Sequence, residues 1–100
     1  MRVQIAGAGL AGLSAAITLA KSGVEANLIS VQPSERAQSV MAEGGINAAL
    51  DTMGEKDHTK EHWEDTMRGG VDLADENAVR NLVEHAPEIV LWLKSIGVPF

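Results

Sequence analysis

Three glycines near the start of the chain have the spacing of a phosphate-binding turn. The segment Gly7-Ala8-Gly9-Leu10-Ala11-Gly12 matches the pattern G-x-G-x-x-G. In such a turn the first glycine permits the tight bend, the second lets a diphosphate approach the backbone, and the third lets the next helix lie close to the sheet. Free N–H groups in the first helical turn, aided by the helix dipole, then hold the phosphates. The chemistry predicted here is binding of a dinucleotide.

The elements around the glycines favour this interpretation over an ordinary tight turn. Arg2 to Ala6 is a short apolar run typical of a buried parallel strand, and Leu10 to Ser22 has apolar residues at helical spacing. Val24 to Ile29 follows as a second short strand, after Gly23 at the position of a left-handed helix cap. Strand, helix and strand in this order predict a right-handed βαβ unit.

One part of the dinucleotide fingerprint is missing from the second strand. An acidic residue is expected about 20 positions after the glycines, where it would bind a ribose hydroxyl. Ser30 stands there instead, and Glu25 lies too early, within the strand.

A second pattern could bind a metal ion. His58-Thr59-Lys60-Glu61-His62 matches H-x-x-E-H, which would place two imidazoles one helical turn apart with a glutamate between them. Because the pair falls at an expected helix start among charged residues, a solvated helix end explains it better, and we predict no metal site. His85 is expected to complement the dipole near a helix C-terminus, and Trp63 and Trp92 are expected to pack in a core or interface.

The rest of the chain is expected to be a loop followed by helices. Residues 31 to 45 are predicted to be mostly loop, with one helical turn around Gln38 to Ala42, and Ile46 to Leu50 to be a short strand or extended segment. An exposed connection over Asp51 to Asp57 then leads to a helix that starts near His58.

Two further helices are expected after Gly69-Gly70, which should end the preceding one. Asp75 is the expected N-cap of the first, and Pro87 is expected in the first turn of the second. The residues expected to face inward are Val79, Leu82 and Val83 on the first helix and Ile89, Leu93 and Ile96 on the second.

Composition excludes several classes of function. Eight Lys and Arg residues against 14 Asp and Glu give a net charge of -6, so the chain lacks the basic surface that nucleic acid requires. It has no cysteine, which excludes disulfides and thiolate metal sites within it. Glycines interrupt the apolar N-terminal stretch, so we expect no signal peptide. We expect the protein to be cytoplasmic.

A longer stretch of the sequence resembles one enzyme family. The segment from Arg36 to Leu50, R-A-Q-S-V-M-A-E-G-G-I-N-A-A-L, is similar to R-S-H-T-V-A-A-[QE]-G-G-I-N-A-A-L of the succinate dehydrogenase and fumarate reductase flavoproteins. His62-Trp63-Glu64-Asp65-Thr66 with Gly69-Gly70 resembles the family's H-x-x-D-T-x-x-G, and Ala86-Pro87 with the last four residues resembles A-P…G-V-P-[FW]. The resemblance covers essentially the whole chain and implies the N-terminal part, residues 1–100, of a larger FAD-binding domain whose capping and C-terminal domains lie elsewhere.

The resemblance also implies which residues contact FAD. They are Gly7, Ala8, Gly9, Leu10, Ala11, Gly12, Ile29, Ser30, Val31, Ala37, Gln38, Ser39, Val40, Met41, Ala42, Glu43, Gly44 and Gly45. Ser30 is common at its position in this family, whereas Val31 replaces the usual Lys. Gln38 replaces the histidine that bonds covalently to the flavin, so we expect FAD to be held non-covalently, with a lower potential that favours reducing fumarate.

The activity implied is hydride transfer between the flavin and a dicarboxylate. No catalytic residue is expected within the chain, because its four arginines match no catalytic motif of the family, and the chain alone should be inactive. Iron–sulfur and membrane-anchor subunits are partners that the resemblance suggests, and they would bring the protein to the inner face of a membrane. L-aspartate oxidase, a relative with a similar diglycine loop and non-covalent FAD, stays an alternative, as does a nucleotide-binding module without catalysis.

Overall fold

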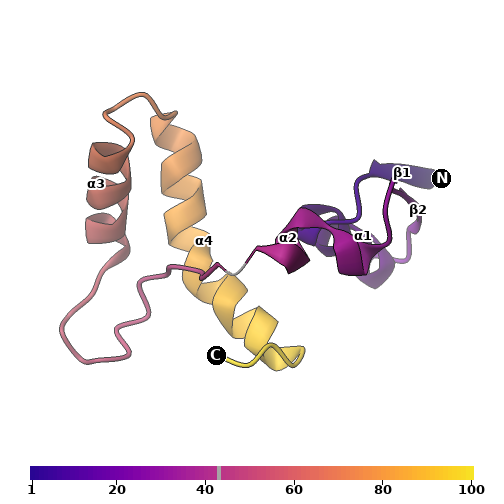
Figure 1. Cartoon of the computed structure of the whole chain (residues 1–100). Coiled ribbons are helices and arrows are strands. Elements are labelled where there is room, and N and C mark those ends of the chain that lie inside the picture. The colour runs from indigo at the N-terminus through magenta and orange to yellow at the C-terminus, as the bar shows by residue number, and fades with distance from the viewer. Residues whose placement is uncertain (43) are drawn as a thin grey trace. The chain divides into compact units, whose positions relative to one another are not determined.

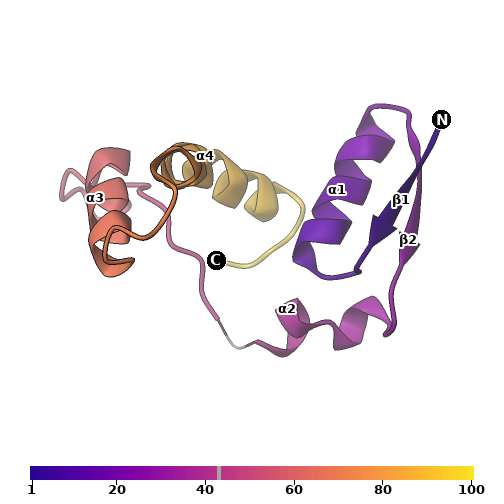
Figure 2. The ribbon, with the colours of Figure 1, turned by 90° about the horizontal axis from the view of Figure 1, so that it is seen from above.

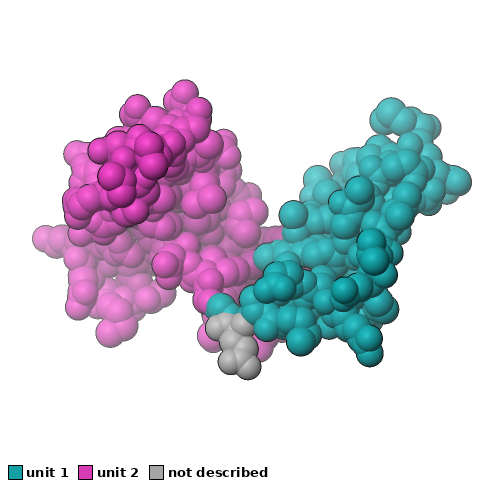
Figure 3. Space-filling model, turned by 45° about the horizontal axis from the view of Figure 1, so that its top comes forward, with its two compact units in different colours: residues 1–44 teal, residues 45–100 magenta. Residues whose placement is uncertain are grey.

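The chain folds as two compact units. The computed structural model describes residues 1–42 and 44–100, and it divides into unit 1, residues 1–44, and unit 2, residues 45–100 (Figure 3). Unit 1 is a βαβ unit with a parallel two-stranded sheet, and unit 2 consists of an irregular segment and two helices. The predicted α/β class is confirmed.

Unit 1 begins with the predicted strand, helix and strand. They are β1 (Arg2–Ala6), α1 (Leu10–Lys21) and β2 (Glu25–Ile29), and α1 covers one face of the sheet (Figure 2). Every residue of β1 pairs with one of β2, from Arg2 with Glu25 to Ala6 with Ile29. An N–H···O bond of 2.8 Å from Gly7 to Ile29 extends this pairing past the end of β1. Both strands therefore end at the same edge of the sheet.

The strands are less buried than the sequence predicts. Val3 and Ile5 of β1 are half-buried on the face that α1 covers, while the alternate residues are exposed. Successive side chains of a strand point to opposite faces, so a sheet covered on one side buries only every second residue. The prediction of a short parallel strand is confirmed, and the prediction that this strand is buried is wrong for the alternate, exposed residues of β1.

Glycine ends α1 as predicted. Gly23 has φ +71°, and its N–H donates to the carbonyl oxygen of Ala20 at 3.0 Å. After β2 the chain makes a short 3₁₀ turn, η1 (Ser34–Arg36), and one helical turn, α2 (Gln38–Met41). The helical turn expected in this loop is confirmed.

The start of unit 2 is irregular, although a short strand was one of the two structures expected for Ile46 to Leu50. Ile46 to Leu50 pairs with no described strand, and the N–H of Leu50 donates to the carbonyl oxygen of Ala48 at 3.0 Å. A bond between residues two apart makes a tight turn, which is incompatible with an extended ladder.

Unit 2 is organised by two helices packed side by side, α3 (Thr59–Gly69) and α4 (Glu76–Ser95) (Figure 1). Val83, Val90 and Leu93 of α4 are at most 8% exposed and form its buried stripe. The predicted N-cap of α4 is confirmed, since a carboxylate oxygen of Asp75 accepts a hydrogen bond from Ala78 N at 2.8 Å.

The prediction of two helices in residues 76–96 was wrong, because α4 continues through Pro87. Proline removes one helical hydrogen bond and disfavours a helix interior. The apolar stripe explains the continuity, since Val83 and Val90 are seven residues apart, lie on the same face on either side of Pro87, and are both buried. His85 consequently lies in mid-helix, with Nδ1 2.8 Å from the carbonyl oxygen of Asn81, and not near a helix C-terminus as predicted.

Three residues predicted to face inward are exposed. Leu82, Ile89 and Ile96 are 61%, 47% and 53% exposed. Leu82 and Ile89 each precede a buried residue by one position, which turns them by about 100° around the helix, away from the stripe. None of the described helices is both long enough and apolar enough to cross a bilayer.

The neighbouring residues Val83 and Leu82 provide a test of this packing. Val83 is 1% exposed, so V83A should lower the free energy of unfolding by about 1–2 kcal/mol through lost burial and a small cavity. L82A, at an exposed position on the same helix, should change it by less than about 0.5 kcal/mol. Urea denaturation of both variants measures the difference, and an equal loss in the two would contradict the assignment of faces.

Candidate functional site

A pocket in unit 1 lies where the two parallel strands end. Its volume is about 760 Å³, within the range of small-molecule sites. The pocket is lined by Ala6, Gly7, Gly9, Ile29, Ser30, Val31, Gln32, Arg36, Ala37, Gln38 and Ser39. In open α/β sheets ligands bind outside the carboxyl ends of the strands, so the fold places this pocket where a nucleotide is expected.

Eight of the residues predicted to bind a cofactor line this pocket together. They come from the glycine turn, the end of β2 and the α2 segment: Gly7, Gly9, Ile29, Ser30, Val31, Ala37, Gln38 and Ser39. Residues 29 to 31 reach this edge because β2 ends there, and residues 37 to 39 return to it after the η1 turn. The structure adds Ala6, Gln32 and Arg36, which the sequence analysis did not include.

The other residues predicted to bind the cofactor are not among the residues that line this pocket. Ala8, within the glycine turn, is buried at 5% exposure. Leu10, Ala11 and Gly12 form the first turn of α1, outside the lining, and Val40, Met41, Ala42 and Gly44 follow the pocket's last lining residue along the chain. Gly45 is the first residue of unit 2, and Glu43 lies outside the described residues. Their part in cofactor binding stays a prediction.

Two of the motif's glycines are required by the fold itself. Gly7 has φ +115°, a conformation that side chains with a Cβ rarely adopt. A Cβ on Gly12 would overlap the carbonyl oxygen of Gly7 and lie 3.0 Å from its carbonyl carbon. Gly12 therefore lets α1 start directly against the turn, as its position in the motif predicts.

The beginning of α1 has an unusual cap. The N-cap residue is Gly9, which has no side chain to bond the free N–H groups of the first turn. The hydroxyl of Ser39, 29 residues further on, accepts a hydrogen bond from Leu10 N at 3.1 Å. A side chain from α2 thus takes the position that a cap or an anion would otherwise fill.

The charge of the unit 1 pocket suits an anion. Arg36 is the single charged side chain among its described lining residues, and no carboxylate lines it. A diphosphate accepts hydrogen bonds from backbone N–H groups at a helix start and from a guanidinium, and this pocket offers both kinds of donor. The signal that could have indicated Arg36 is its position two residues before Gln38, in the segment already assigned to the cofactor.

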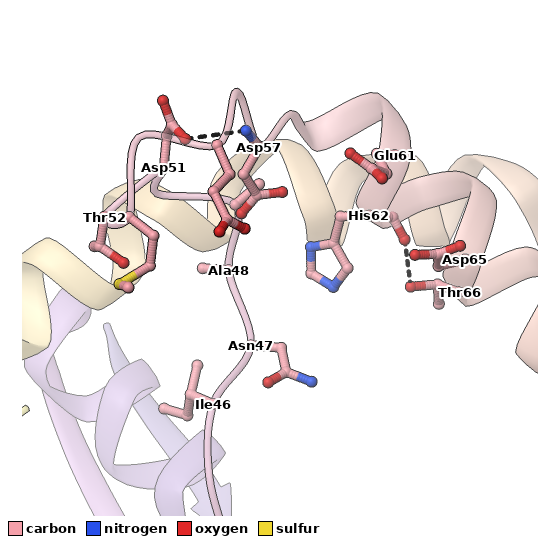
Figure 4. A pocket seen from close by; sticks show the side chains of 13 residues that line it. Ile46, Asn47, Ala48, Asp51, Thr52, Asp57, Glu61, His62, Asp65 and Thr66 are labelled. Carbon is pink, nitrogen blue, oxygen red and sulfur yellow. Dashed lines mark hydrogen bonds between the residues drawn. The ribbon is translucent and has the colours of Figure 1, made fainter.

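Unit 2 contains a second pocket of about 680 Å³, between its irregular segment and α3 (Figure 4). It is lined by Ile46, Asn47, Ala48, Ala49, Asp51, Thr52, Met53, Glu55, Asp57, Glu61, His62, Asp65 and Thr66. A carboxylate oxygen of Asp51 accepts from Asp57 N at 3.1 Å, and the hydroxyl of Thr66 donates to the carbonyl oxygen of His62 at 2.7 Å. This is called the acidic pocket below.

The chemistry of the acidic pocket does not suit an anionic ligand. Five carboxylates line it, and they would repel a phosphate or a dicarboxylate. The described residues contain no group of three or more His, Asp or Glu side chains arranged to hold a metal ion. His58, the first histidine of H-x-x-E-H, is the N-cap residue of α3, so the two histidines begin a helix as expected. The unit 1 pocket is therefore the better candidate.

The indole of Trp63 packs within unit 2 as predicted. The side chain is half-buried, the guanidinium of Arg80 lies 4.9 Å from its ring centroid, and its Nε1 donates to the carbonyl oxygen of Glu76 at 3.5 Å. The ring thus joins α3 to the first turns of α4, and its face is occupied by a residue of the same chain. Trp92 is also half-buried.

Comparison with known proteins identifies the family to which the chain is similar. Residues 2–100 match the family described as FAD binding domain. The chain is 46% identical over 98 residues to the succinate dehydrogenase flavoprotein subunit of Bacillus subtilis, covering 98% of this chain and 17% of that protein. It is 41% identical over 96 residues to a mitochondrial succinate dehydrogenase [ubiquinone] flavoprotein subunit of Xenopus laevis, covering 96% of this chain and 14% of that protein. It is 40% identical over 98 residues to L-aspartate oxidase of Vibrio cholerae, covering 98% of this chain and 18% of that protein. The chain spans less than a fifth of the length of these relatives.

Proposed function

Since the chain belongs to the family of FAD-binding domains, we propose that it holds the FAD of a flavoenzyme that interconverts fumarate and succinate. One observation carries the proposal. Eight residues assigned to the cofactor on sequence grounds line one pocket at the carboxyl ends of both strands, although they come from three separate segments. The high identity to succinate dehydrogenase flavoprotein subunits supports the choice of substrate class.

In this proposal each part of the pocket binds one part of the cofactor. The turn from Gly7 to Leu10 holds the diphosphate, with Arg36 adding a positive charge. Ser30, at the end of β2, lies where the ribose of a dinucleotide is held in folds of this kind. The segment from Ala37 to Ser39, which also lines the pocket, lies along the flavin in the proposal.

The flavin, when bound, supplies two-electron chemistry toward a dicarboxylate. The residues of this chain hold and orient it. Gln38 lines the pocket. Its place in the segment that resembles the family's flavin-linking segment supports the proposal that FAD is held non-covalently. A non-covalent flavin with a lower potential favours fumarate reduction over succinate oxidation.

Substrate binding belongs to parts of the protein outside these 100 residues. Three of the chain's four arginines are paired: Arg2 with Glu25, Arg68 with Asp65 and Arg80 with Glu76. The fourth is Arg36, in the cofactor pocket. Because the chain spans less than a fifth of the length of its relatives, we propose that residues 1–100 are the N-terminal portion of a larger FAD-binding domain and are inactive alone. Capping and C-terminal domains bind the dicarboxylate, and iron–sulfur and membrane-anchor subunits tether the cytoplasmic protein to the membrane.

Enzyme assays of the complete protein test the proposal. Reduced viologen should be oxidised on addition of fumarate, at a rate at least about tenfold above that with no acceptor. Residues 1–100 alone, with FAD added, serve as the inactive control. A complete protein that carries FAD but oxidises no viologen with fumarate would contradict the fumarate assignment.

The identity to an L-aspartate oxidase supports a second candidate. A protein of that type would form hydrogen peroxide from L-aspartate and oxygen, which a peroxidase-coupled assay detects. If fumarate does not oxidise the reduced flavin, and neither succinate nor L-aspartate reduces the oxidised flavin, the result favours a nucleotide-binding module without catalysis.

A further inference from the structure

We draw no further inference here: the strongest candidate, the acidic pocket between the irregular segment of unit 2 and α3, carries none, because a cluster of carboxylates does not by itself make a site and nothing among the described residues shows what would fill it.

Discussion

Replacing Gly12 with alanine should lower both the stability of unit 1 and its affinity for FAD, the affinity by at least about a hundredfold. A Cβ at this position overlaps the carbonyl oxygen of Gly7, and it would also lie 3.4 Å from Ile5 Cγ2. Overpacking costs about 1–3 kcal/mol in general, and backbone cannot rotate aside as a side chain can. Alanine favours the helix by about 1 kcal/mol over glycine, which offsets only part of the destabilisation caused by the overlap. Flavin fluorescence titration and thermal unfolding of the complete protein measure the two losses.

Two further glycine substitutions serve as controls for G12A. G69A adds a Cβ in α3 that meets nothing within 4 Å, so stability and FAD affinity should stay the same or rise slightly. G9A places a Cβ 3.1 Å from the flexible hydroxyl of Ser39, so the fold should survive while FAD binding weakens. If G12A binds FAD as tightly as G69A does, α1 does not need to approach the turn this closely.

Acid precipitation of the flavin-loaded protein should leave all of the yellow colour in the supernatant. By the resemblance to the succinate dehydrogenase and fumarate reductase flavoproteins, Gln38 is expected at the position of the flavin-linking histidine. A carboxamide nitrogen, whose lone pair is delocalised into the carbonyl, is a poor nucleophile. The 100 residues contain no cysteine and no tyrosine that could form a link instead. Their three histidines, His58, His62 and His85, all belong to unit 2.

The absorbance of the supernatant at the flavin maximum, compared with that of the protein before acid, gives the released fraction. Q38A is the matched control, and it should release its flavin just as completely because the side chain at this position forms no bond. A yellow pellet from the unmodified protein would refute non-covalent binding, and a colourless pellet from Q38A alone would then identify Gln38 as the attachment point.

The sequence predicts the first unit well because its signals are local. Strand β1 has the predicted bounds, and α1 ends within one residue of its predicted end, at a glycine whose positive φ was expected. The glycine spacing and the short strands depend on steric rules that act over a few residues. Grouping Gly7 with Gln38 relied on the resemblance, since no periodic pattern links the glycine turn to α2.

The errors arose where packing over a distance overrides local preference. Pro87 suggested a helix start, but the buried stripe through Val83 and Val90 carries α4 past it. Leu82 and Ile89 are apolar and were predicted to face inward, yet they are exposed, because the side of a helix that is buried depends on where its neighbour lies. Arg36 was missed as a pocket residue because its position depends on η1, a turn with no strong sequence signal.

The placement of Trp63 and Trp92 in unit 2 has a practical consequence for spectroscopy. Both tryptophans and the single phenylalanine belong to residues 45–100, and the chain has no tyrosine, so residues 1–44 contain no aromatic side chain. Ultraviolet emission from this chain therefore reports the helical pair alone, whereas visible absorption by a bound flavin would report the βαβ unit. Heating one sample while recording both wavelengths would show whether the two halves melt together or one before the other.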